Sequence, residues 1–517
     1  MTNIFIPAFC VFIAYKAARF IKNLREVRYV PGYRSMFSPL SLLGAVLPYS
    51  WFNYGRNWYW IMKDTAFFKY THDMITIVPW VSGDPAYFTC SPEVTQQLLG
   101  NEGQVQLVRP PMLGSPLLLW GGNMFASNGE MWKRHRRVVS PAFGTKLYAT
   151  VIQQTCFIYK DMMETEGWSA KSSVDVDGFL RITMRLAFLV ISRCGFGISL
   201  SWSSDEKGDL NTAKVNDALA MVTETVLLRL MIPNWAYKLP IKRLHEIDET
   251  WKFLAVFMRD SIKSRAQMLS GDPELLSKSD DVFTRLVSAS DNVGKYNLSE
   301  EEVIGNTFLL MFAGYETTAL VLAATITFLA IHQDEQEKAY REITSVIKGG
   351  LEPTLEDLSK LPHTLACFNE ALRMYPASPM TMRTMPQDVT VKVKRPAEET
   401  IVIKKDSLVI FNTVCTHRNP NFFPEPSKFK PSRWYDVSEH DITMFGSGPR
   451  SCIGRKFGHT EALTFLSLLL RDWHLDVSLR AGETREQFKE RVMGDAGPIG
   501  MSFGVTGPMN LRLTRRP

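Results

Sequence analysis

One cysteine of this chain lies in a loop whose composition is unusual for a buried thiol. The stretch FGSGPRSCIG, from Phe445 to Gly454, places Cys452 among three glycines, a proline and an arginine. Buried alone, a cysteine behaves as a small apolar side chain and needs no such setting. The composition of the loop instead predicts a turn that fixes the position of one sulfur atom and points it toward a binding partner.

A second candidate for chemistry is the stretch AGYETT, from Ala313 to Thr318. Glu316 and Thr317 put an acid beside a hydroxyl, a pair that can relay protons into a dry pocket. Gly314 removes a side chain where a flat molecule could approach the backbone. A threonine hydroxyl here can also bond a carbonyl one turn back and weaken the helix. The alternative interpretation is a buried glutamate that backbone groups satisfy.

A third candidate is a group of charges. Glu370 and Arg373 are three residues apart, so on a helix they share one face and can pair. Arg433 can reach the same carboxylate and complete a desolvated, bidentate cluster, which would pin the segment that leads to the cysteine loop. The alternative is a surface salt bridge, which contributes little to stability.

Helices must position most of these side chains. Ser299 and Glu302 form the pattern of a capping box, and the run from Val303 to Ile331 is almost entirely apolar. Such a run fits either a membrane span or the central buried helix of a large protein. Asn306 and Glu316 favour the buried helix, because a charge near the middle of a membrane span is costly.

Strand-like alternation is confined to short segments, so the chain is predicted to be mainly α with a small β part. We expect one large domain over residues 31–517, preceded by an N-terminal segment at residues 1–30, since the sequence shows no repeat and no long linker. The expected strands are Met74–Trp80, Ala86–Cys90, Val389–Lys394, Thr400–Lys404, Leu408–Phe411 and part of Met501–Leu513.

The N-terminal segment is apolar from Ile4 to Tyr15, and basic residues then recur from Lys16 to Arg28. The apolar run is shorter than the ~20 residues that cross a bilayer. It is either a signal anchor with its basic flank in the cytosol or an amphipathic helix in the membrane interface. A cleaved signal peptide fits poorly, because the positive charge follows the apolar run. We expect this segment to attach the chain to a membrane.

The composition excludes several classes of protein. The 517 residues carry a net charge of +6, and 45% of them are hydrophobic, which is typical of a globular chain. Basic and acidic residues are interspersed, so nucleic acid is not a predicted partner. The seven cysteines are odd in number, widely spaced and without a CxxC pair. That pattern argues against a disulfide framework and against a structural zinc site.

Taken together, these patterns resemble one family, the cytochrome P450 haem-thiolate monooxygenases. The family's cysteine-loop pattern, FxxGxRxCxG, is filled at every fixed place, and the other family patterns follow the same order along the chain. The resemblance covers roughly residues 30 to 517 and is fungal in style. The matching residues are Trp132 and Arg136; Ala313, Gly314, Glu316, Thr317 and Thr318; Glu370 and Arg373; Pro431 and Arg433; and Phe445, Gly448, Arg450, Cys452 and Gly454.

The resemblance implies haem b as the cofactor. Cys452, as a thiolate, would be the axial ligand of the iron, and its electron donation favours cleavage of the O–O bond on the opposite face. Phe445 would shield the sulfur, and Gly454 would let the helix that follows lie flat against the porphyrin. Ala313 and Gly314 would lie on the oxygen-binding side. The residues expected to hold the haem propionates are Trp132, Arg136, Arg383 and Arg450.

The resemblance also implies a monooxygenase reaction in which Thr317 and Glu316 are catalytic. Thr317 would hydrogen-bond the oxygen that is being reduced, and Glu316 would help to deliver protons through water. Electrons must come from outside, because no flavin or NADPH fold is left over. The implied partner is NADPH-cytochrome P-450 reductase. The implied location is the endoplasmic reticulum membrane, with the catalytic domain in the cytosol.

The stretches that the resemblance assigns to the substrate pocket are aliphatic, aromatic and rich in methionine. We therefore expect a lipophilic substrate, such as a terpenoid, sterol, fatty or aromatic compound of secondary or xenobiotic metabolism. The stretches are Ser115–Phe125, Leu227–Trp235, Phe308–Thr317, Pro376–Met382 and Pro498–Val505.

Two alternative functions stay open at this point. One is an electron-independent haem-thiolate isomerase or dehydratase, although such members tend to lose the acid–Thr pair that this chain keeps. The other is a non-catalytic haem sensor, which would usually carry a second domain to transmit its signal.

Overall fold

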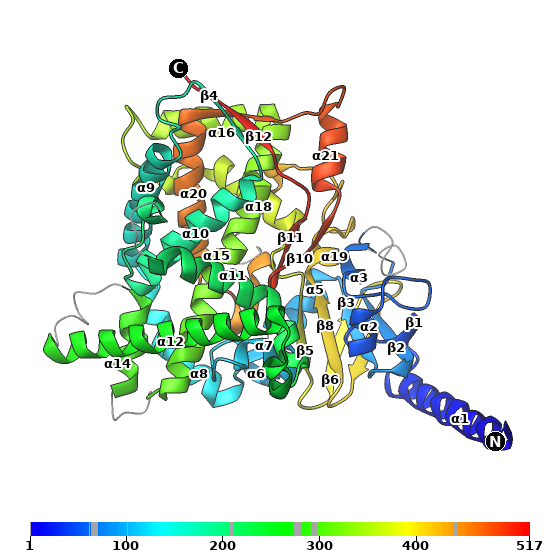
Figure 1. The fold of residues 1–517 in the computed structure, drawn as a ribbon. Helices are drawn as coiled ribbons and strands as arrows, with labels where there is room; N and C mark the ends of the chain where they lie inside the picture. The colour runs from blue at the N-terminus through cyan, green and yellow to red at the C-terminus, as the bar shows by residue number, and fades with distance from the viewer. Residues whose placement is uncertain are drawn as a thin grey trace. The chain divides into compact units, whose positions relative to one another are not determined.

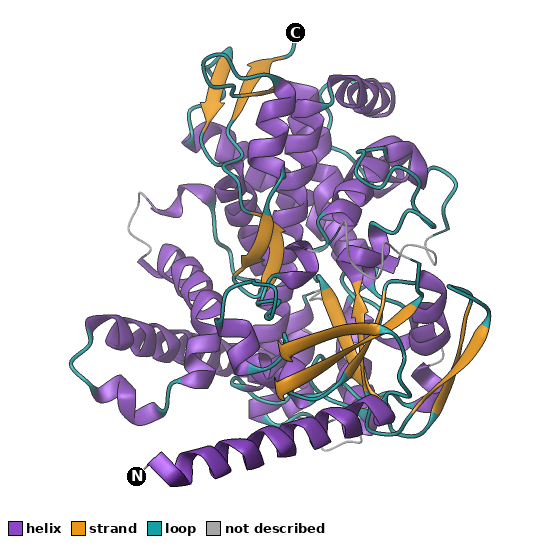
Figure 2. Cartoon of the chain, turned by 90° about the vertical axis from the view of Figure 1, so that its right-hand side faces the viewer, coloured by secondary structure: helices purple, strands orange, loops and turns teal. Residues whose placement is uncertain are grey.

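Helices dominate the structure, as the sequence predicts, and the strands form small sheets (Figures 1 and 2). The computed structural model describes residues 2–61, 63, 71–100, 102–205, 210–272, 281–291, 297–438 and 443–517.

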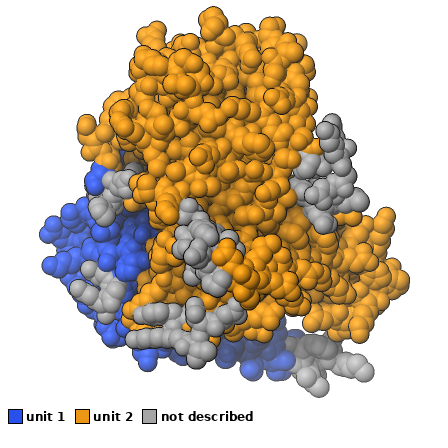
Figure 3. Space-filling view, turned by 90° about the vertical axis from the view of Figure 1, so that its left-hand side faces the viewer, with its two compact units in different colours: residues 1–110, 378–428, 438–451 blue, residues 111–377, 429–437, 452–517 orange. Residues whose placement is uncertain are grey.

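The contacts between residues divide the chain into two compact units, which Figure 3 colours separately. The N-terminal helix belongs to unit 1, so it packs on that unit instead of standing apart from it. The interpretation of residues 31–517 as one domain stays a prediction. Unit 1 comprises residues 1–110, 378–428 and 438–451, and unit 2 comprises residues 111–377, 429–437 and 452–517.

Unit 1 is built on a five-stranded sheet in the order β1-β2-β3-β8-β5. β1 (Gly32–Phe37) runs parallel to β2 (Met74–Ser82), which is antiparallel to β3 (Ala86–Thr89). β3 is parallel to β8 (Leu408–Asn412), which is antiparallel to β5 (Met380–Thr384). The sheet thus joins strands from two distant parts of the chain.

A hairpin and several helices complete unit 1. The hairpin pairs β6 (Val389–Val393) with β7 (Glu399–Ile403) in an antiparallel arrangement. Figure 2 shows the long N-terminal helix running beside the strands of the sheet. The helices are α1 (Thr2–Glu26), α2 (Leu42–Val46), α3 (Trp58–Ile61), α5 (Pro92–Thr95), α6 (Glu102–Val105) and α19 (Thr413–His417).

Unit 2 is a helical assembly around one long helix, α15, which contacts α10, α18 and α20 (Figure 1). Its helices are α7 (Pro111–Leu118), α8 (Gly129–Val139), α9 (Thr145–Thr165), α10 (Phe179–Phe196), α11 (Leu210–Met231), α12 (Lys242–Gly271), α14 (Val282–Asp291), α15 (Glu300–Ile331), α16 (Gln333–Val346), α17 (Leu355–Ser359), α18 (Pro362–Met374), α20 (Arg455–Asp472) and α21 (Arg485–Met493).

Two small antiparallel sheets lie at the edges of unit 2. β12 (Leu511–Arg515) pairs with β4 (Ser173–Val176) on one side and β9 (Trp473–Val477) on the other. β10 (Ala496–Ile499) and β11 (Ser502–Val505) form a hairpin. The turn of this hairpin reaches α15, which matters for the site described below.

The predicted central helix is confirmed. Ser299 accepts a hydrogen bond from the backbone N–H of Glu302, and the Glu302 side chain closes the capping box in return. Such a cap contributes about 1 kcal/mol to a helix. In the described part of the chain, α15 is the one helix long and apolar enough to cross a membrane, but 78% of its most apolar window is buried within the protein.

Most of the predicted strands are present as β2, β3, β6, β7, β8, β11 and β12. Five further strands were not predicted, namely β1, β4, β5, β9 and β10. β10 forms a hairpin with the neighbouring β11, whereas the other four pair with segments farther away in the sequence. Their pairing partners, and not an alternating pattern of their own, therefore make them strands.

Candidate functional site

Cys452 lies just ahead of α20, and with Cys10 it is one of two exposed cysteines. All seven cysteines are free thiols, five of them are buried, and Cys452 keeps exposed surface. The backbone N–H groups of Gly454 and Arg455 face its sulfur. Surrounding protein atoms raise the pKa of the Cys452 thiol, and these N–H groups, with the cations of Arg136 and Arg455, oppose that effect. The sulfur is deeply set, accessible, and supplied with donors that favour a thiolate.

Two glycines of the cysteine loop differ in whether the surrounding protein requires glycine at their position. Gly448 has a φ of +71°, and a Cβ atom there would lie 1.9 Å from the carbonyl oxygen of Leu99. Only glycine fits that position without rearrangement. At Gly454, by contrast, a Cβ atom would lie 3.8 Å from the Cys452 sulfur, an ordinary contact. The protein itself does not require Gly454, so its role toward a bound porphyrin stays a prediction.

The central helix α15 is buried along its length except on one short face. From Val303 to Ile331, every residue is buried apart from Ala313, Gly314 and Thr317. These three residues share one helix face, because they are one and four positions apart. We call them the α15 window. The α15 window keeps partly exposed surface, whereas the rest of the helix from Val303 to Ile331 is buried.

Two observations place neighbouring helices around Cys452 and the α15 window. A Cβ atom built on Gly458, in the first turn of α20, would lie 3.4 Å from Thr318 Oγ1, next to the window. On α8, burial lowers the pKa of Arg136, and a negative charge on Cys452 acts to raise it, so the guanidinium lies near the sulfur. Trp132 precedes Arg136 by one helical turn and is half-buried. The side chains predicted to surround a haem thus converge within unit 2.

The Thr317 hydroxyl donates a hydrogen bond to the carbonyl oxygen of Ala313, at 2.7 Å. The same bond, one turn back, is made by Thr307, Thr325 and Thr327. It therefore marks no flaw, and α15 runs unbroken through the window. The Thr317 oxygen can accept a hydrogen bond as it stands, but it must rotate away from Ala313 to donate one.

Gly314 has a packing reason that the sequence did not reveal. A Cβ atom there would lie 2.7 Å from the side chain of Ile191 on α10. The glycine lets α10 and α15 approach closely. Its exposed surface in the window is compatible with the predicted approach of a flat ligand, which stays a prediction.

Glu316 is buried and turned toward the β10–β11 hairpin. Its carboxylate accepts hydrogen bonds from the Ser502 hydroxyl at 2.6 Å and from the backbone N–H of Met501 at 3.2 Å. A Cβ atom on Gly500 would lie 1.9 Å from Glu316 Oε1, so the turn must carry glycine there. Burial raises the pKa of Glu316 to about 7, although these hydrogen bonds lower it in part. Glu316 is therefore a proton-holding group beside the α15 window, but it is not part of it.

The structure brings the predicted charge cluster together. Arg373 binds both carboxylate oxygens of Glu370, at 2.8 and 2.9 Å, and both side chains are completely buried. Arg433 reaches the same carboxylate at 3.2 Å. The Trp434 ring N–H and the Lys430 backbone N–H add bonds at 2.9 and 3.0 Å. A buried carboxylate with five donors is fully compensated, and it anchors the segment that carries Arg433.

Two further arginines predicted to hold propionates lie in unit 1, and a carboxylate joins them. Arg383 binds Glu102 through two nitrogens, at 2.9 and 3.2 Å, and Arg450 binds it at 3.2 Å. Burial lowers the pKa of Arg450 to about 10, and Glu102 opposes that effect. Glu102 thus offsets one of two buried positive charges. Phe445, also in unit 1, is half-buried at the end of a short helical turn, Thr443–Phe445.

Glu102, Ser502 and Ile191 are the residues that sequence reasoning missed. Each acts through a partner more than 100 positions away, Glu102 on Arg383, Ser502 on Glu316 and Ile191 on Gly314. The one sequence signal was at Glu102, an acid in a stretch otherwise free of charge from Gly100 to Leu107.

These side chains fit the haem that the resemblance implies. An accessible sulfur with N–H donors suits a thiolate ligand. Arg136 supplies a cation near that sulfur, and the α15 window supplies an uncharged surface with a hydroxyl. Within unit 1, Arg383 and Arg450 retain a net positive charge suited to carboxylates.

Comparison with known proteins identifies a family. The model of the family described as "Cytochrome P450" matches residues 49–499. Cytochrome P450 monooxygenase 124 of Postia placenta is 29% identical over 495 residues, with 94% of each chain covered. Cyclooctat-9-en-7-ol 5-monooxygenase of Streptomyces melanosporofaciens is 26% identical over 401 residues, covering 75% of this chain and 80% of that protein.

A solved structure shares the fold. A zebra fish cytochrome P450 determined with progesterone superposes with a TM-score of 0.61 at 21% identity, covering 84% of this chain and 94% of that chain. At this identity the likeness extends to the fold alone.

The charge cluster around Glu370 yields a stability prediction. Glu370→Gln leaves two buried guanidinium groups short of their counter-charge, so we expect the free energy of unfolding to fall by about 3–5 kcal/mol. Glu356→Gln is the control, because the exposed Glu356–Lys360 pair should contribute less than about 1 kcal/mol. Urea unfolding followed by circular dichroism measures both. Equal losses for the two variants would contradict a compensating role for Glu370.

The raised pKa of Glu316 predicts a pH dependence of stability. The folded-state pKa is about 7 against an ordinary value of 4.5, so the folded state holds the proton more tightly. This contribution is complete below pH 4.5 and is lost as the pH rises through 7, at a cost of at most about 3 kcal/mol. Glu316→Gln cannot titrate, so the variant should gain stability relative to the wild type between pH 5 and pH 8. Urea midpoints whose difference is constant over that range would contradict this.

Proposed function

The chain belongs to the cytochrome P450 family and is a haem-thiolate monooxygenase, and we propose that it inserts one atom of O2 into a lipophilic small molecule with electrons from NADPH-cytochrome P-450 reductase. NADPH supplies two electrons, the substrate gains one oxygen atom, and two protons convert the other atom to water. The observation that carries the proposal is the α15 window, a small uncharged face with one hydroxyl in an otherwise buried helix, together with the accessible sulfur of Cys452.

In this proposal, Cys452 would bind the haem iron. Trp132, Arg136, Arg383 and Arg450 would bind the propionates. Bound haem supplies the reductive activation of O2, which no amino-acid side chain provides. Guanidinium groups suit this task because they match a carboxylate in a planar, bidentate fashion.

In this proposal, Thr317 and Glu316 deliver the protons that the reaction consumes. Thr317 lies in the α15 window, and its oxygen is able to accept a hydrogen bond while its hydroxyl donates to the carbonyl oxygen of Ala313. With a pKa of about 7, Glu316 is protonated on roughly half of the molecules at neutral pH, which suits a group that both gives and regains a proton. The proton must travel from the Glu316 carboxyl to the neighbouring Thr317 through water or a rotation of Glu316 away from Ser502.

The lipophilic substrate is supported by an aromatic wall in unit 2. Trp120 stacks on Phe308 with ring centroids 4.8 Å apart, and Phe308 stacks on Phe312 at 6.4 Å. Phe312 directly precedes the α15 window. A wall of stacked rings beside the reacting position favours apolar molecules over charged ones. The relative named for cyclooctat-9-en-7-ol supports a small-molecule substrate.

We also propose that α1 attaches the chain to the endoplasmic reticulum membrane, with the catalytic part in the cytosol. Its first half exposes apolar side chains, including Ile6 at 67% and Phe9 at 65%. Its second half is docked on unit 1, because Lys16 donates to the carbonyl of Val81 at 2.6 Å and Phe20 packs on Trp80. The undocked turns measure about 20 Å, less than the ~30 Å hydrocarbon core. As docked, α1 enters the membrane without crossing it.

The proposal is tested with purified full-length protein, a membrane-bound NADPH reductase and a library of lipophilic compounds. Compounds that shift the haem absorption spectrum are expected to be oxygenated, with NADPH and O2 consumed in proportion to product. A thiolate haem signature without NADPH consumption for any compound that binds would overturn the monooxygenase proposal. Products formed without NADPH would overturn it as well.

Replacing the sulfur tests the ligand assignment. Cys452→His is expected to keep haem at most, to lose the thiolate band in the spectrum of the reduced protein with carbon monoxide, and to form no product. Cys10→Ser is the control, since that exposed thiol lies on α1 and should leave both readouts unchanged. Full monooxygenase activity in Cys452→His would contradict the assignment.

A matched pair of threonine variants tests the proton route. Thr317→Ala is expected to raise hydrogen peroxide release relative to product several-fold. Reduced oxygen is released as peroxide when proton delivery to it is disturbed. Thr325→Ala removes the same backbone-bonded hydroxyl from a buried position of the same helix and should leave the ratio unchanged. Peroxide and product are quantified in the same reaction. The same ratio in both variants would remove Thr317 from the proton route.

A further inference from the structure

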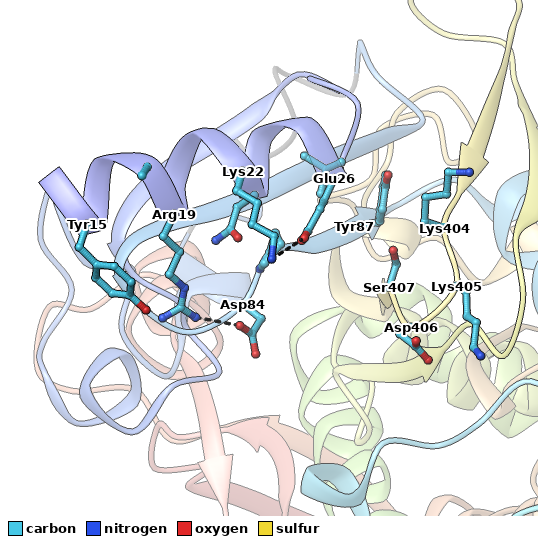
Figure 4. A pocket seen from close by; sticks show the side chains of 14 residues that line it. Tyr15, Arg19, Lys22, Glu26, Asp84, Tyr87, Lys404, Lys405, Asp406 and Ser407 are labelled. Carbon is cyan, nitrogen blue, oxygen red and sulfur yellow. Dashed lines mark hydrogen bonds and ion pairs between the residues drawn. The ribbon is translucent and has the colours of Figure 1, made fainter.

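A cavity of about 870 Å³ lies beneath α1 in unit 1, and none of the residues assigned to the haem lines it (Figure 4). One wall is the second half of α1, from Tyr15 to Glu26, with Val27 directly after it. The other walls are the turn between β2 and β3 and the turn between β7 and β8. The lining residues are Tyr15, Ala18, Arg19, Lys22, Asn23, Glu26, Val27, Asp84, Pro85, Tyr87, Lys404, Lys405, Asp406 and Ser407.

Several polar groups of this cavity lack a protein partner among the described residues. The Tyr87 side chain is completely buried, and its hydroxyl makes no hydrogen bond. The Asn23 amide and the Ser407 hydroxyl also have no partner in the described part of the chain, and Asn23 is only 6% exposed. Buried polar groups are nearly always hydrogen-bonded in proteins, and one left unpaired costs about 1–3 kcal/mol. The cavity therefore holds donors and acceptors that await a ligand.

The cavity contains both positively and negatively charged side chains, which limits the kinds of ligand that it can bind. Arg19 pairs with Asp84 at 3.0 Å, whereas Lys22 and Glu26 are only loosely paired at 3.7 Å. Figure 4 shows Lys22 and Glu26 across the gap from Tyr87 and Ser407. The Glu26 carboxylate would repel a ligand that carries only negative charge. The Lys22 ammonium would repel a ligand that carries only positive charge. A molecule that carries both charges satisfies both groups.

The far rim repeats this combination of charges. Lys405 and Asp406 are neighbours in the β7–β8 turn, and neither side chain has a partner among the described residues. Lys404 does not contribute, because it pairs with Asp388 at 2.6 Å and extends away from α1 in Figure 4. The cavity thus offers a cation and an anion on each side.

The position of the cavity along α1 indicates where the ligand comes from. Most exposed large apolar side chains of α1 lie between Ile6 and Tyr15, where the cavity begins, and Ile21, 46% exposed, is the one beyond Tyr15 among the described residues of the helix. Trp80, 37% exposed, packs on Phe20 at 5.4 Å beside it. Tryptophan and basic residues next to an apolar helix are typical of the headgroup layer of a membrane. When the apolar half of α1 enters a bilayer, the cavity lies at the level of the headgroups.

We propose that the cavity beneath α1 binds the headgroup of a zwitterionic glycerophospholipid of the phosphatidylethanolamine type. The phosphate lies near Lys22, and the primary ammonium lies near Glu26 and the hydroxyls of Tyr87 and Ser407. The acyl chains follow the exposed apolar half of α1. The lipid thereby joins α1 to the sheet of unit 1 and fixes how the helix leaves it.

The test uses the full-length protein in a phosphate-free detergent and a short-chain phosphatidylethanolamine below its micelle-forming concentration. Calorimetry is expected to show saturable binding of this lipid and no binding of inorganic phosphate. Tyr87→Phe and Lys22→Gln should each weaken lipid binding at least tenfold. Lys392→Gln, an exposed lysine on β6 of the same unit, is the matched control and should leave binding unchanged.

Two measurements distinguish a defect in the lipid site from a defect in folding or in membrane attachment. Tyr87→Phe removes an unpaired buried hydroxyl, so its melting temperature without lipid should equal or exceed that of the wild type. Phe9→Ser with Phe12→Ser should reduce attachment to phosphatidylethanolamine vesicles and leave short-chain lipid binding intact, so a failed anchor is distinguishable from a failed site.

Three results would overturn the lipid site. They are absence of short-chain lipid binding, phosphate binding of equal affinity, and loss of affinity in Lys392→Gln as large as that in Tyr87→Phe. None of them bears on the monooxygenase proposal, whose readouts depend on haem.

Discussion

The need to keep one accessible sulfur as a thiolate governs the arrangement of unit 2. Surrounding protein atoms raise the pKa of Cys452, while the N–H groups of Gly454 and Arg455 and the cation of Arg136 stabilise its charged form. Burial is the larger influence, so the pKa of the thiol stays raised, and a bound partner with positive charge would favour the thiolate. Haem iron, when bound, would supply that charge. The first turn of α20, the end of α8 and the middle of α15 are positioned around this demand.

Glu370 and Glu316 are two buried carboxylates of unit 2 whose surroundings differ. Around Glu370 both carboxylate oxygens accept hydrogen bonds from arginine, tryptophan and backbone donors. Glu316 is also buried, but fewer donors face it, and its pKa of about 7 leaves it between two states. A fully compensated carboxylate suits a structural anchor, and an incompletely compensated one suits proton transfer. The structure thus separates the anchoring acid from the titrating acid by their hydrogen bonds.

The sequence predicts those features whose signals are local. The capping box at Ser299 and the buried run of α15 follow from neighbouring residues, and the structure contains both. Arg433 lies some 60 residues from Glu370 and Arg373, so the sequence offered its contact with them only as a candidate, and the structure confirms it. Local patterns also suggested a weakened helix at Thr317, but its hydrogen bond is shared by three other threonines of α15 and interrupts nothing.

What the sequence leaves out arises from contacts between distant segments. The packing of Ile191 against Gly314, the pairing of Glu102 with two arginines and the bond from Ser502 to Glu316 join residues that no short window contains. The cavity beneath α1 exists only because that helix docks on two turns from different parts of unit 1. Periodicity and composition describe a segment's own preference, whereas these features depend on where another segment has been placed.

The bond between the Cys452 sulfur and haem iron is the central claim, and X-ray absorption at the iron K-edge measures it without reference to turnover. The account predicts one sulfur scatterer in the first shell of the purified protein, and its disappearance in a Cys452→Ser variant that retains haem. A first shell containing only nitrogen and oxygen in the wild type, or a sulfur scatterer that persists in the variant, would contradict it.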